Sequence, residues 1–282
     1  MCGFVGFIDR SDNKDKILTD MMNTIIHRGP DSEGKFYDSD AALGFRRLSI
    51  IDITESGNQP IYNEDSTKVL VFNGEIYNYQ ELRDDLIKAG HVFKTHTDSE
   101  TLLHGYEEYG TRLVYKLRGM YAFVIWDQKE KTLFGARDMF GVKPFYYAKM
   151  NGSFMFASEI KALLEHPSFD KQFNEEQLGN YLTFQFVPSD ETFFKGVYCL
   201  KPGHYFLYKE GELSIRRYFE PNFTGDSNMT PEEAAVKVEE VMKDSVKMHK
   251  ISDVEVASYL SSGVDSSYLT YLAQVDRTFT VG

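Results

Sequence analysis

The chain opens with the stretch MCGFVGF, residues 1–7, which places a cysteine directly after the initiator methionine. If an aminopeptidase removes Met1, Cys2 carries both a thiol and a free α-amine. The ordinary pKa of such an amine, about 7.7–8.0, makes it a usable base near neutral pH. One residue can then supply a nucleophile and the base that activates it. The alternative is that Cys2 is a small buried hydrophobic residue, the usual role of a single free cysteine. We expect Met1 to be removed, because the first interpretation requires the free amine.

The composition predicts a folded protein that binds no polyanion through its net charge. The 282 residues are 42% hydrophobic, and 43 acidic against 31 basic residues give a formal charge of -12. This length predicts about two domains, and the charge argues against nucleic-acid binding. We find neither an apolar run of about 18 residues that would span a membrane nor a signal peptide, so we expect a cytoplasmic protein. Cys2 and Cys199 are too far apart in the sequence to suggest a disulfide framework.

Short strands separated by turns are the dominant pattern from Phe4 to about Tyr218. The sequence KMNGSFMF places Asn151-Gly152 between two aromatic-rich runs, which is a strong signal for a β-hairpin. YAFVIWDQKEKTLFGARD and HYFLYKEGELSIRRYF indicate two further hairpins. Hairpins with separate helices predict an α+β fold. The helices are expected where apolar residues share one face, at Ile17, Leu18, Met21, Met22 and Ile25, and at Leu82 and Leu86 before a stop at Gly90.

A second unit begins after the polar stretch EPNFTGDSNM. Thr230-Pro231-Glu232-Glu233 fits a capping box with proline at the first helical position, and it predicts a helix over about 231–249. An apolar strand around 254–260, the loop SSGVDSS, a helix over 266–273 and the stretch TFTVG then form the opening of a β-loop-α-β unit. Such a unit needs further parallel strands, so we expect the second domain to be incomplete at residue 282. The predicted boundaries are a first domain over 2–210, a linker over 211–230 and the start of the second domain over 231–282.

Three further features are weak indicators when each is taken alone. Asn73-Gly74 follows a predicted strand, where an amide side chain and a glycine N–H can converge on a developing oxyanion, although an ordinary turn is the more common explanation. Arg47 is a natural bidentate partner for a carboxylate, and a solvated arginine on an edge strand is the alternative. Asp98 precedes a predicted helix, where an N-cap is the simplest interpretation.

Seven segments in combination form a pattern that points to one family, although no single segment does. They are MCGFVG, HRGPD (27–31), RLSIID (47–52), NGEIYN (73–78), TDSE (97–100), RDMFGVKPFYY (137–147) and ASEIKAL (157–163). Together they resemble the glutaminase domain of glutamine-dependent asparagine synthetases, a class II glutamine amidotransferase of the N-terminal nucleophile superfamily. The resemblance covers residues 2 to about 210. It implies an α+β sandwich in which two antiparallel sheets lie between helical layers (αββα). HRGPD and RDMFGVKP are expected to be mainly architectural, with Arg28 lining the pocket.

The resemblance also implies a reaction and a set of site residues. Cys2 would attack the side-chain amide of glutamine and form a glutamyl thioester, with Asn73-Gly74 as the oxyanion hole. Arg47 would hold the α-carboxylate of glutamine, and Asp98 with the region of Glu75 would hold its α-amine. The resemblance implies no cofactor and no metal for this half-reaction. The implied glutamine-binding residues are Arg47, Leu48, Ser49, Ile50, Ile51, Asn73, Gly74, Glu75 and Asp98.

The loop Ser261–Ser266, between the second unit's predicted strand and helix, resembles the pyrophosphate loop of ATP pyrophosphatases. Backbone amides in such a loop at a helix N-terminus suit a phosphate, although an ordinary capped turn has the same appearance. Ser262 stands where the family usually has a glycine, whereas Gly263 and Asp265 keep their places. The resemblance implies that the loop binds ATP, which together with Mg²⁺ would adenylate aspartate. The implied ATP-binding residues are Leu260, Ser261, Ser262, Gly263, Val264, Asp265 and Ser266.

The leading hypothesis is therefore a glutaminase domain joined to the start of a synthetase domain. Ammonia released at Cys2 would amidate ATP-activated aspartate to asparagine, so the partners are glutamine, aspartate and ATP, with no nucleic acid and no membrane. A homodimer is compatible with the sequence. The SSGVDSS loop argues against other class II amidotransferases, such as glucosamine-6-phosphate synthase or phosphoribosylpyrophosphate amidotransferase. A synthetase with a different acceptor and a catalytically silent glutamine-binding module stay open as alternatives. We also expect the 282-residue chain to hydrolyse glutamine without making asparagine, because its second domain is expected to be incomplete.

Overall fold

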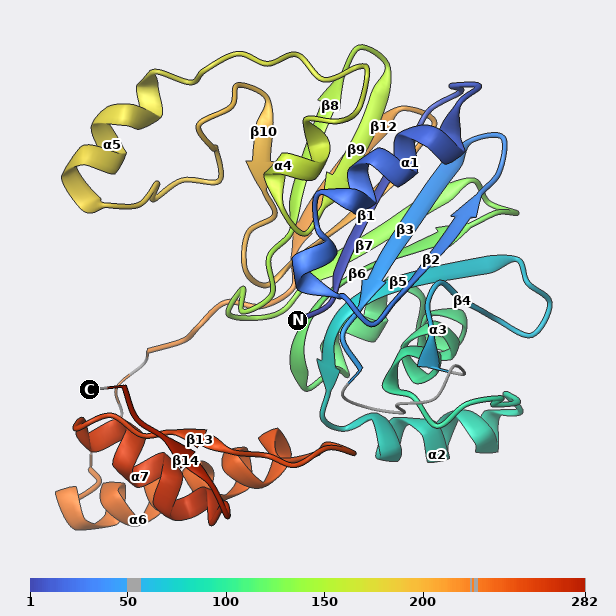
Figure 1. The fold of residues 1–282 in the computed structure, drawn as a ribbon. Coiled ribbons are helices and arrows are strands. Elements are labelled where there is room, and N and C mark those ends of the chain that lie inside the picture. The colour runs from blue at the N-terminus through green and yellow to red at the C-terminus, as the bar shows by residue number, and fades with distance from the viewer. Residues whose placement is uncertain (50–56, 224, 226–227, 282) are drawn as a thin grey trace. The chain divides into compact units, whose positions relative to one another are not determined.

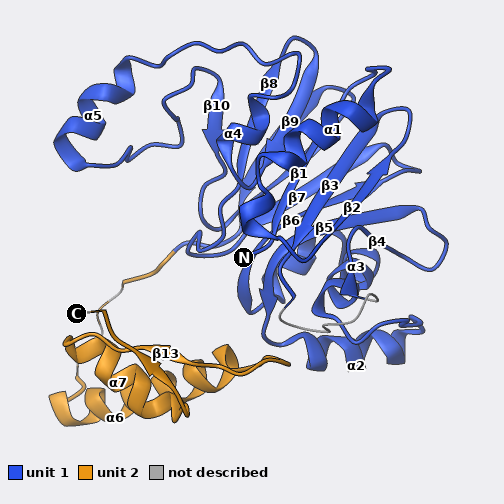
Figure 2. Ribbon diagram, viewed as in Figure 1, with its two compact units in different colours: residues 1–49, 54–220 blue, residues 50–53, 221–282 orange. Residues whose placement is uncertain are grey.

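The described residues form two compact units, one up to Glu220 and one from Pro221 onward (Figures 1 and 2). The first unit carries the described residues predicted to bind glutamine, and the second carries the loop predicted to bind ATP. The computed structural model describes residues 1–49, 57–223, 225 and 228–281.

Two antiparallel sheets, each with six strands among the described residues, form the centre of the first unit (Figure 1). The first sheet contains, in spatial order, β10 (Val197–Cys199), β8 (Tyr146–Met150), β9 (Ser153–Ala157), β1 (Gly3–Ile8), β3 (Ala41–Arg47) and β2 (Ser32–Tyr37). The second contains β12 (Glu212–Arg217), β11 (His204–Lys209), β7 (Thr132–Arg137), β6 (Gly119–Asp127), β5 (Lys68–Ile76) and β4 (Ile61–Tyr62).

One hydrophobic core lies between the two sheets, and alternation along β1 shows how the sequence builds it. Phe4 joins a cluster with Trp126 and Phe206 from the second sheet. Val5 and Phe7 belong instead to the cluster on the opposite face, which α1 (Lys14–Asn23) and α4 (Ile160–Leu163) cover. Because successive side chains of a strand point to opposite faces, β1 is buried on both sides.

Helices also cover the second sheet. The helix α3 (Asp98–Tyr109) packs on β5, and α2 (Tyr79–Ala89) packs on α3. The first unit therefore has the predicted order of helices, sheet, sheet and helices. Its remaining described helical segments are η1 (Ile26–Arg28), η3 (Gly110–Tyr115) and α5 (Glu176–Phe184).

Two turns predicted from local sequence are present in the structure, and both depend on residues with positive φ angles. Asn151 and Gly152 have φ angles of 48° and 81° and form the two-residue turn of the β8–β9 hairpin. Gly90 ends α2 with a φ of 104°, in the left-handed region that glycine adopts without a steric penalty. The hairpin predicted at Asn151-Gly152 and the helix stop predicted at Gly90 are therefore confirmed.

The second unit contains α6 (Pro231–His249), β13 (Ser258–Tyr259), α7 (Val264–Ala273) and β14 (Thr278–Phe279). The predicted capping box at the start of α6 is confirmed, since the Thr230 and Glu233 side chains each accept a hydrogen bond from the other's backbone N–H. β13 and β14 pair in parallel. The strand predicted over 254–260 is longer than the observed one, because only two residues of β13 find a ladder partner in β14.

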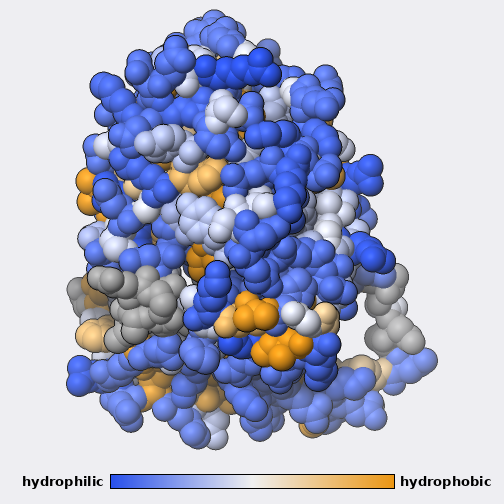
Figure 3. Space-filling model, turned by 90° about the vertical axis from the view of Figure 1, so that its right-hand side faces the viewer, coloured by the Kyte–Doolittle hydropathy of each residue, from blue (hydrophilic) through white to orange (hydrophobic). Residues whose placement is uncertain are grey.

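The surface in Figure 3 is mainly hydrophilic, with small hydrophobic patches. Among the helices of the described residues, we find none with both the length and the apolar character that a membrane span requires.

Candidate active site

Cys2 lies just before β1 and packs against the core between the two sheets. The Leu48 N–H donates to the Cys2 sulfur at 3.3 Å, and the thiol donates to the Leu48 carbonyl oxygen, also at 3.3 Å. Burial raises the pKa of the Cys2 thiol, while the Leu48 N–H and the positive charges of Arg47 and Lys143 lower it. The thiol is therefore protonated at neutral pH, and a base would have to accept its proton before the sulfur could act as a nucleophile.

Arg28, from the HRGPD segment, fixes the backbone of Cys2. Its Nε donates to the Cys2 carbonyl oxygen at 2.9 Å, and its Nη1 donates to Glu159 Oε1 at 3.0 Å. Gly3 provides space for this arginine, since a Cβ there would lie 3.0 Å from Arg28 Cδ and 3.1 Å from Ile25 Cδ1. The glycine in MCGF and the arginine in HRGPD thus depend on each other sterically.

Asn73 lies near the end of β5, opposite Ala122 of β6. Its side chain is on the same face of the strand as that of Val71, which belongs to the core against which Cys2 packs. Asn73 is 1% exposed, and its Nδ2 has no hydrogen-bond partner among the described residues. Buried polar groups without a partner are rare in folded proteins. This amide is therefore a donor in place for a ligand.

Gly74 follows Asn73 within β5, so the ordinary-turn interpretation of Asn73-Gly74 is wrong. The strand was expected to end before this pair, but its ladder with β6 continues to Ile76. A Cβ at Gly74 would lie 2.2 Å from the Met120 carbonyl oxygen and 2.7 Å from Tyr121 Cα. Glycine is required here because the two backbones approach closely.

Arg47 ends β3, which lies between β1 and β2. It is 5% exposed, and its Nη1 donates to Asn58 Oδ1 at 2.8 Å. The alternative of a solvated edge-strand arginine is therefore wrong. Ser49 continues the chain past Arg47, and the predicted residues Ile50 and Ile51 lie outside the described residues.

Asp98 is the first residue of α3 and is buried. Its interpretation as an N-cap is wrong, because the N-cap is Thr97, whose side chain accepts from the Glu100 N–H. The Ile76 N–H donates to Asp98 Oδ2 at 2.9 Å. Burial raises the pKa of Asp98 to about 7, and the negative charge of Glu75 acts in the same direction. The buried carboxyl group of Asp98 and the half-buried one of Glu75 together suit a cationic ligand.

Lys143 is a buried charged residue that the sequence analysis did not single out. Burial lowers the pKa of its ammonium, while the charges of Glu75 and Cys2 raise it, so Lys143 lies within electrostatic reach of both. Asp138 holds the segment in place, since its Oδ2 accepts from the N–H groups of Lys143 at 3.0 Å and Tyr121 at 3.2 Å. RDMFGVKP thus brings a charge to the site as well as a structural turn.

Comparison with known families gives this geometry its context. A family model described as a glutamine amidotransferase domain matches residues 1–219. The chain belongs to this family. A second model, described as asparagine synthase, matches residues 237–282.

The amidotransferase chain is similar to curated asparagine synthetases. It is 43% identical over 293 residues to glutamine-hydrolyzing asparagine synthetase 1 of Bacillus subtilis (strain 168), covering 100% of this chain and 46% of that relative. It is 35% identical over 277 residues to a probable glutamine-hydrolyzing asparagine synthetase of Dictyostelium discoideum, covering 95% of this chain and 44% of that relative. The chain thus spans about half the length of these relatives.

The fold of the amidotransferase chain is shared with a solved structure. Glutamine phosphoribosylpyrophosphate amidotransferase from B. subtilis, complexed with ADP and GMP, matches with a TM-score of 0.58 at 18% identity. The match covers 99% of this chain and 65% of that one. Together with the two layered antiparallel sheets, it confirms the predicted α+β fold of the N-terminal nucleophile type.

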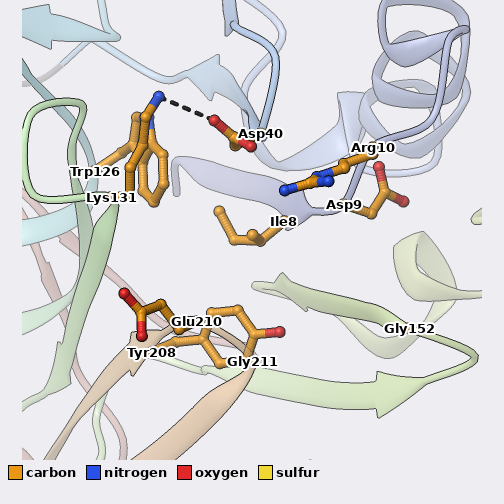
Figure 4. Close-up of a pocket in the computed structure, with 10 residues that line it drawn as sticks. All are labelled: Ile8, Asp9, Arg10, Asp40, Trp126, Lys131, Gly152, Tyr208, Glu210 and Gly211. Carbon is orange, nitrogen blue, oxygen red and sulfur yellow. Dashed lines mark ion pairs between the residues drawn. The ribbon is translucent and has the colours of Figure 1, made fainter.

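The amidotransferase domain also has a pocket of about 670 Å³, at the end of β1 remote from Cys2 (Figure 4). Ile8 lines it and lies six positions after Cys2, which is about 20 Å along an extended strand. Lys131 Nζ pairs with Asp40 Oδ2 at 2.9 Å and lies 5.7 Å from the centre of the Trp126 ring. The described residues that line this pocket include none of those predicted to bind glutamine or ATP.

The predicted ATP-binding loop lies between β13 and α7 of the second unit. The hydroxyl oxygens of Ser261 and Ser266 are 2.8 Å apart, and the Gly263 N–H donates to Ser261 Oγ at 3.2 Å. Leu260 continues the strand ladder, since its N–H donates to the Phe279 carbonyl oxygen at 2.8 Å. The helix starts two residues earlier than predicted, with Gly263 as its N-cap. The exposed residues of the loop are Ser261, Ser262, Gly263, Val264 and Asp265.

Proposed function

We propose that the first unit hydrolyses the side-chain amide of glutamine to glutamate and ammonia. The Cys2 sulfur attacks the amide carbon, the nitrogen takes up a proton, and the C–N bond breaks to leave a glutamyl thioester and ammonia. Water then cleaves the thioester, which releases glutamate and restores the thiol. The α-amine of Cys2, free once Met1 has been removed, is the proposed proton carrier in both steps.

The Asn73 Nδ2, which finds no hydrogen-bond partner among the described residues, is the observation that carries this proposal. A buried amide donor costs folding free energy when nothing accepts its proton. It gains an acceptor when the amide oxygen of glutamine becomes an oxyanion, and that is where a donor contributes most to the rate. The N–H of Gly74 is the proposed second donor. The positive charge of Lys143 favours the thiolate of Cys2 and the negative charge that passes to the oxyanion.

Recognition of the amino-acid end of glutamine is proposed to use opposite charges. Arg47 would bind the α-carboxylate, and Asp98 with Glu75 would bind the α-ammonium. The ammonium would also favour the ionised form of Asp98, whose pKa is otherwise raised to about 7 by burial. Leu48 and Ser49 would border the same ligand. These local groups explain how a protein with a net charge of -12 binds a zwitterion.

For the whole protein we propose asparagine synthesis, in which the released ammonia amidates ATP-activated aspartate. The match of residues 237–282 to the asparagine synthase model and the names of the relatives support this proposal. The Ser261–Ser266 loop would hold the phosphates of ATP with Mg²⁺, because it combines hydroxyl groups with the N-terminus of α7. A cytoplasmic location and a homodimer are part of the same proposal.

The proposed domains are a glutaminase domain that extends from residue 2 past the expected end at 210, a linker, and the start of a synthetase domain at 231. The extension to Glu220 is supported by β12, which pairs with β11 along its whole length.

Release of glutamate and ammonia from glutamine by the 282-residue chain tests the central step. We expect hydrolysis by the wild-type chain and none by Cys2→Ala, with an unchanged fold. Cys199→Ala is the matched control, since Cys199 is also a half-buried free cysteine. Normal turnover by Cys2→Ala would contradict the proposed nucleophile. No hydrolysis by wild type from which Met1 has been removed would favour the silent glutamine-binding module.

A further inference from the structure

A cluster of two histidines and two glutamates joins α2, α3 and the β4–β5 hairpin, which lie side by side in Figure 1. Glu64 lies in the hairpin loop, His91 follows α2, and His104 and Glu107 lie one turn apart on α3. One nitrogen or oxygen atom from each of the four side chains lies within 4.8 Å of the others. The cluster is separate from the residues predicted to bind glutamine.

The distances within this cluster fit a tetrahedral ion. His104 Nδ1 lies 3.0 Å from Glu107 Oε2 and 3.4 Å from Glu64 Oε2. His91 Nδ1 lies 3.5 Å from Glu64 Oε1 and 4.0 Å from Glu107 Oε2. Four ligand atoms at about 2.0–2.1 Å from Zn²⁺ are about 3.3 Å apart in a regular tetrahedron. The four side chains therefore need only small shifts to surround one ion.

In both histidines, the ring nitrogen that faces away from the cluster, Nε2, lies near a carboxylate. Nε2 of His91 lies 3.6 Å from Glu108 Oε2, and Nε2 of His104 lies 3.6 Å from Glu100 Oε1. Histidines that bind a metal through one ring nitrogen usually direct the other N–H at a carboxylate or a carbonyl group. In both rings Nδ1 therefore faces the cluster while Nε2 faces such a partner.

The two carboxylates of the cluster are also oriented by their neighbours. Asn63 Nδ2 donates to Glu107 Oε1 at 2.7 Å, which leaves Oε2 toward the histidines. The Val92 N–H donates to Glu64 Oε1 at 3.2 Å, and Oε2 is the oxygen nearest His104. Each imidazole must be neutral to bind a metal, and two carboxylates with two neutral imidazoles then carry a charge of about -2, which a divalent cation neutralises.

We propose that Glu64, His91, His104 and Glu107 bind one divalent transition-metal ion, for which Zn²⁺ is best suited. Imidazole and carboxylate ligands in a tetrahedron are typical of zinc. Four protein ligands leave no open coordination position, so the ion is structural. The resemblance implied no metal for the glutaminase half-reaction. The sequence does not reveal this set of ligands, because they are spread from position 64 to position 107 and follow no ligand motif.

The ion has a consequence for the helix that carries Asp98. His104 lies six residues after Asp98 on α3, a rise of about 9 Å. An ion that joins His104 and Glu107 to His91 fastens α3 to the chain after α2. Removal of the metal should therefore lower the melting temperature of the first unit, whether or not the chain hydrolyses glutamine.

Zinc titration of the untagged, chelator-treated 282-residue chain tests the site, followed by calorimetry and by melting temperature. We expect saturable binding of one Zn²⁺ ion per chain and a higher melting temperature with zinc. Loss of a residue that hydrogen-bonds to a metal ligand typically weakens metal binding about 10- to 100-fold. His91→Gln removes a ligand itself, so it should weaken zinc binding at least about tenfold. Glu64→Gln should do the same. Glu64 is the most exposed of the four side chains and His91 is only partly buried, so neither substitution removes a fully buried side chain.

His204→Gln is the matched control, since His204 lies on β11 outside the cluster and should leave zinc binding unchanged. Co²⁺ in place of Zn²⁺ should give the visible absorption of a tetrahedral site in wild type and lose it in His91→Gln. Absence of saturable zinc binding would show that the cluster is only a network of ion pairs and would overturn the proposal. Zinc binding that is equally strong in His91→Gln and Glu64→Gln would overturn it as well, since the ion would then lie elsewhere.

Discussion

Substitution of Asn73 by alanine tests two separate effects of its amide group, one on the stability of the fold and one on the rate of glutamine hydrolysis. In the glutamine-free protein, Nδ2 of Asn73 is buried and finds no acceptor in the described part of the chain. A buried donor without a partner costs about 1–3 kcal/mol of stability. In the transition state, an oxyanion donor typically contributes about 2.7–4 kcal/mol, or a factor of about 10² to 10³ in rate. Asn73→Ala should therefore slow glutamine hydrolysis by about that factor without lowering the free energy of unfolding.

Asn174→Ala is the control for this prediction. Asn174 is also a buried asparagine, but its Nδ2 donates to Glu191 Oε2 at 2.9 Å and to the Thr192 carbonyl oxygen at 3.2 Å. Its removal leaves acceptors unpaired and should lower the free energy of unfolding by about 1–3 kcal/mol with normal turnover. The two variants should thus show opposite patterns in steady-state glutaminase kinetics and in urea denaturation.

An unchanged turnover number in Asn73→Ala would refute the oxyanion-hole assignment. Loss of stability in Asn73→Ala similar to that in Asn174→Ala would show that the amide has a structural partner. A rise of the Michaelis constant alone would show that Asn73 contributes to binding glutamine in the ground state rather than to stabilising the transition state.

Three further predictions concern the charged residues of the site. Arg47→Ala should raise the Michaelis constant for glutamine about 10- to 150-fold, because a charge-assisted hydrogen bond contributes about 1.5–3 kcal/mol. Arg47→Lys should raise this constant less than Arg47→Ala does. A Michaelis constant unchanged in Arg47→Ala would exclude a role in carboxylate binding. The kcat/KM for glutamine should rise with pH through an apparent pKa near 7, because Asp98 binds the ammonium only when ionised and burial raises the pKa of Asp98 to about 7. This pH dependence should disappear in Asp98→Asn. If the rise persists in that variant, it belongs to another group. Lys143→Met should raise the pKa of the Cys2 thiol, because the charge that lowers this pKa is lost, and alkylation of Cys2 should then require a higher pH. Lys143→Arg should restore the pH dependence of alkylation, and a dependence unaffected by Lys143→Met would argue against an electrostatic role.

The same ionisation of Asp98 predicts the direction of a stability change. Its pKa in the folded protein is about 7, above the value of about 3.9 for an unperturbed aspartate. The folded protein therefore binds more protons than the unfolded chain between these values. The contribution of Asp98 to stability is present below about pH 4 and is lost as the pH rises through 7, and saturating glutamine should reduce this loss.

Local chemistry explains why much of the fold could be predicted. The turn at Asn151-Gly152, the stop at Gly90 and the capping box at Thr230 depend on residues that are close in the sequence. The strand expected over 254–260 was too long because an apolar run does not by itself provide a ladder partner.

Contacts between distant segments explain what the sequence did not reveal. Lys143 reaches the site because Asp138 accepts from the N–H groups of Lys143 and Tyr121, which lie 22 positions apart, and no local pattern encodes this contact. The histidine and glutamate cluster likewise forms only when α2, α3 and the β4–β5 hairpin pack together. Asn73 was singled out, but only the folded chain shows that its Nδ2 has no partner among the described residues.

The most direct test of the account is the intact mass of the chain before and after treatment with a glutamine-like electrophile. We predict that Met1 is absent, that one adduct forms, that peptide mapping places it on the N-terminal Cys2 rather than on Cys199, and that glutamine protects against it. A chain that retains Met1 and still hydrolyses glutamine at full rate, or an active chain in which Cys2 stays unmodified, would contradict the claim that Cys2 is the terminal nucleophile.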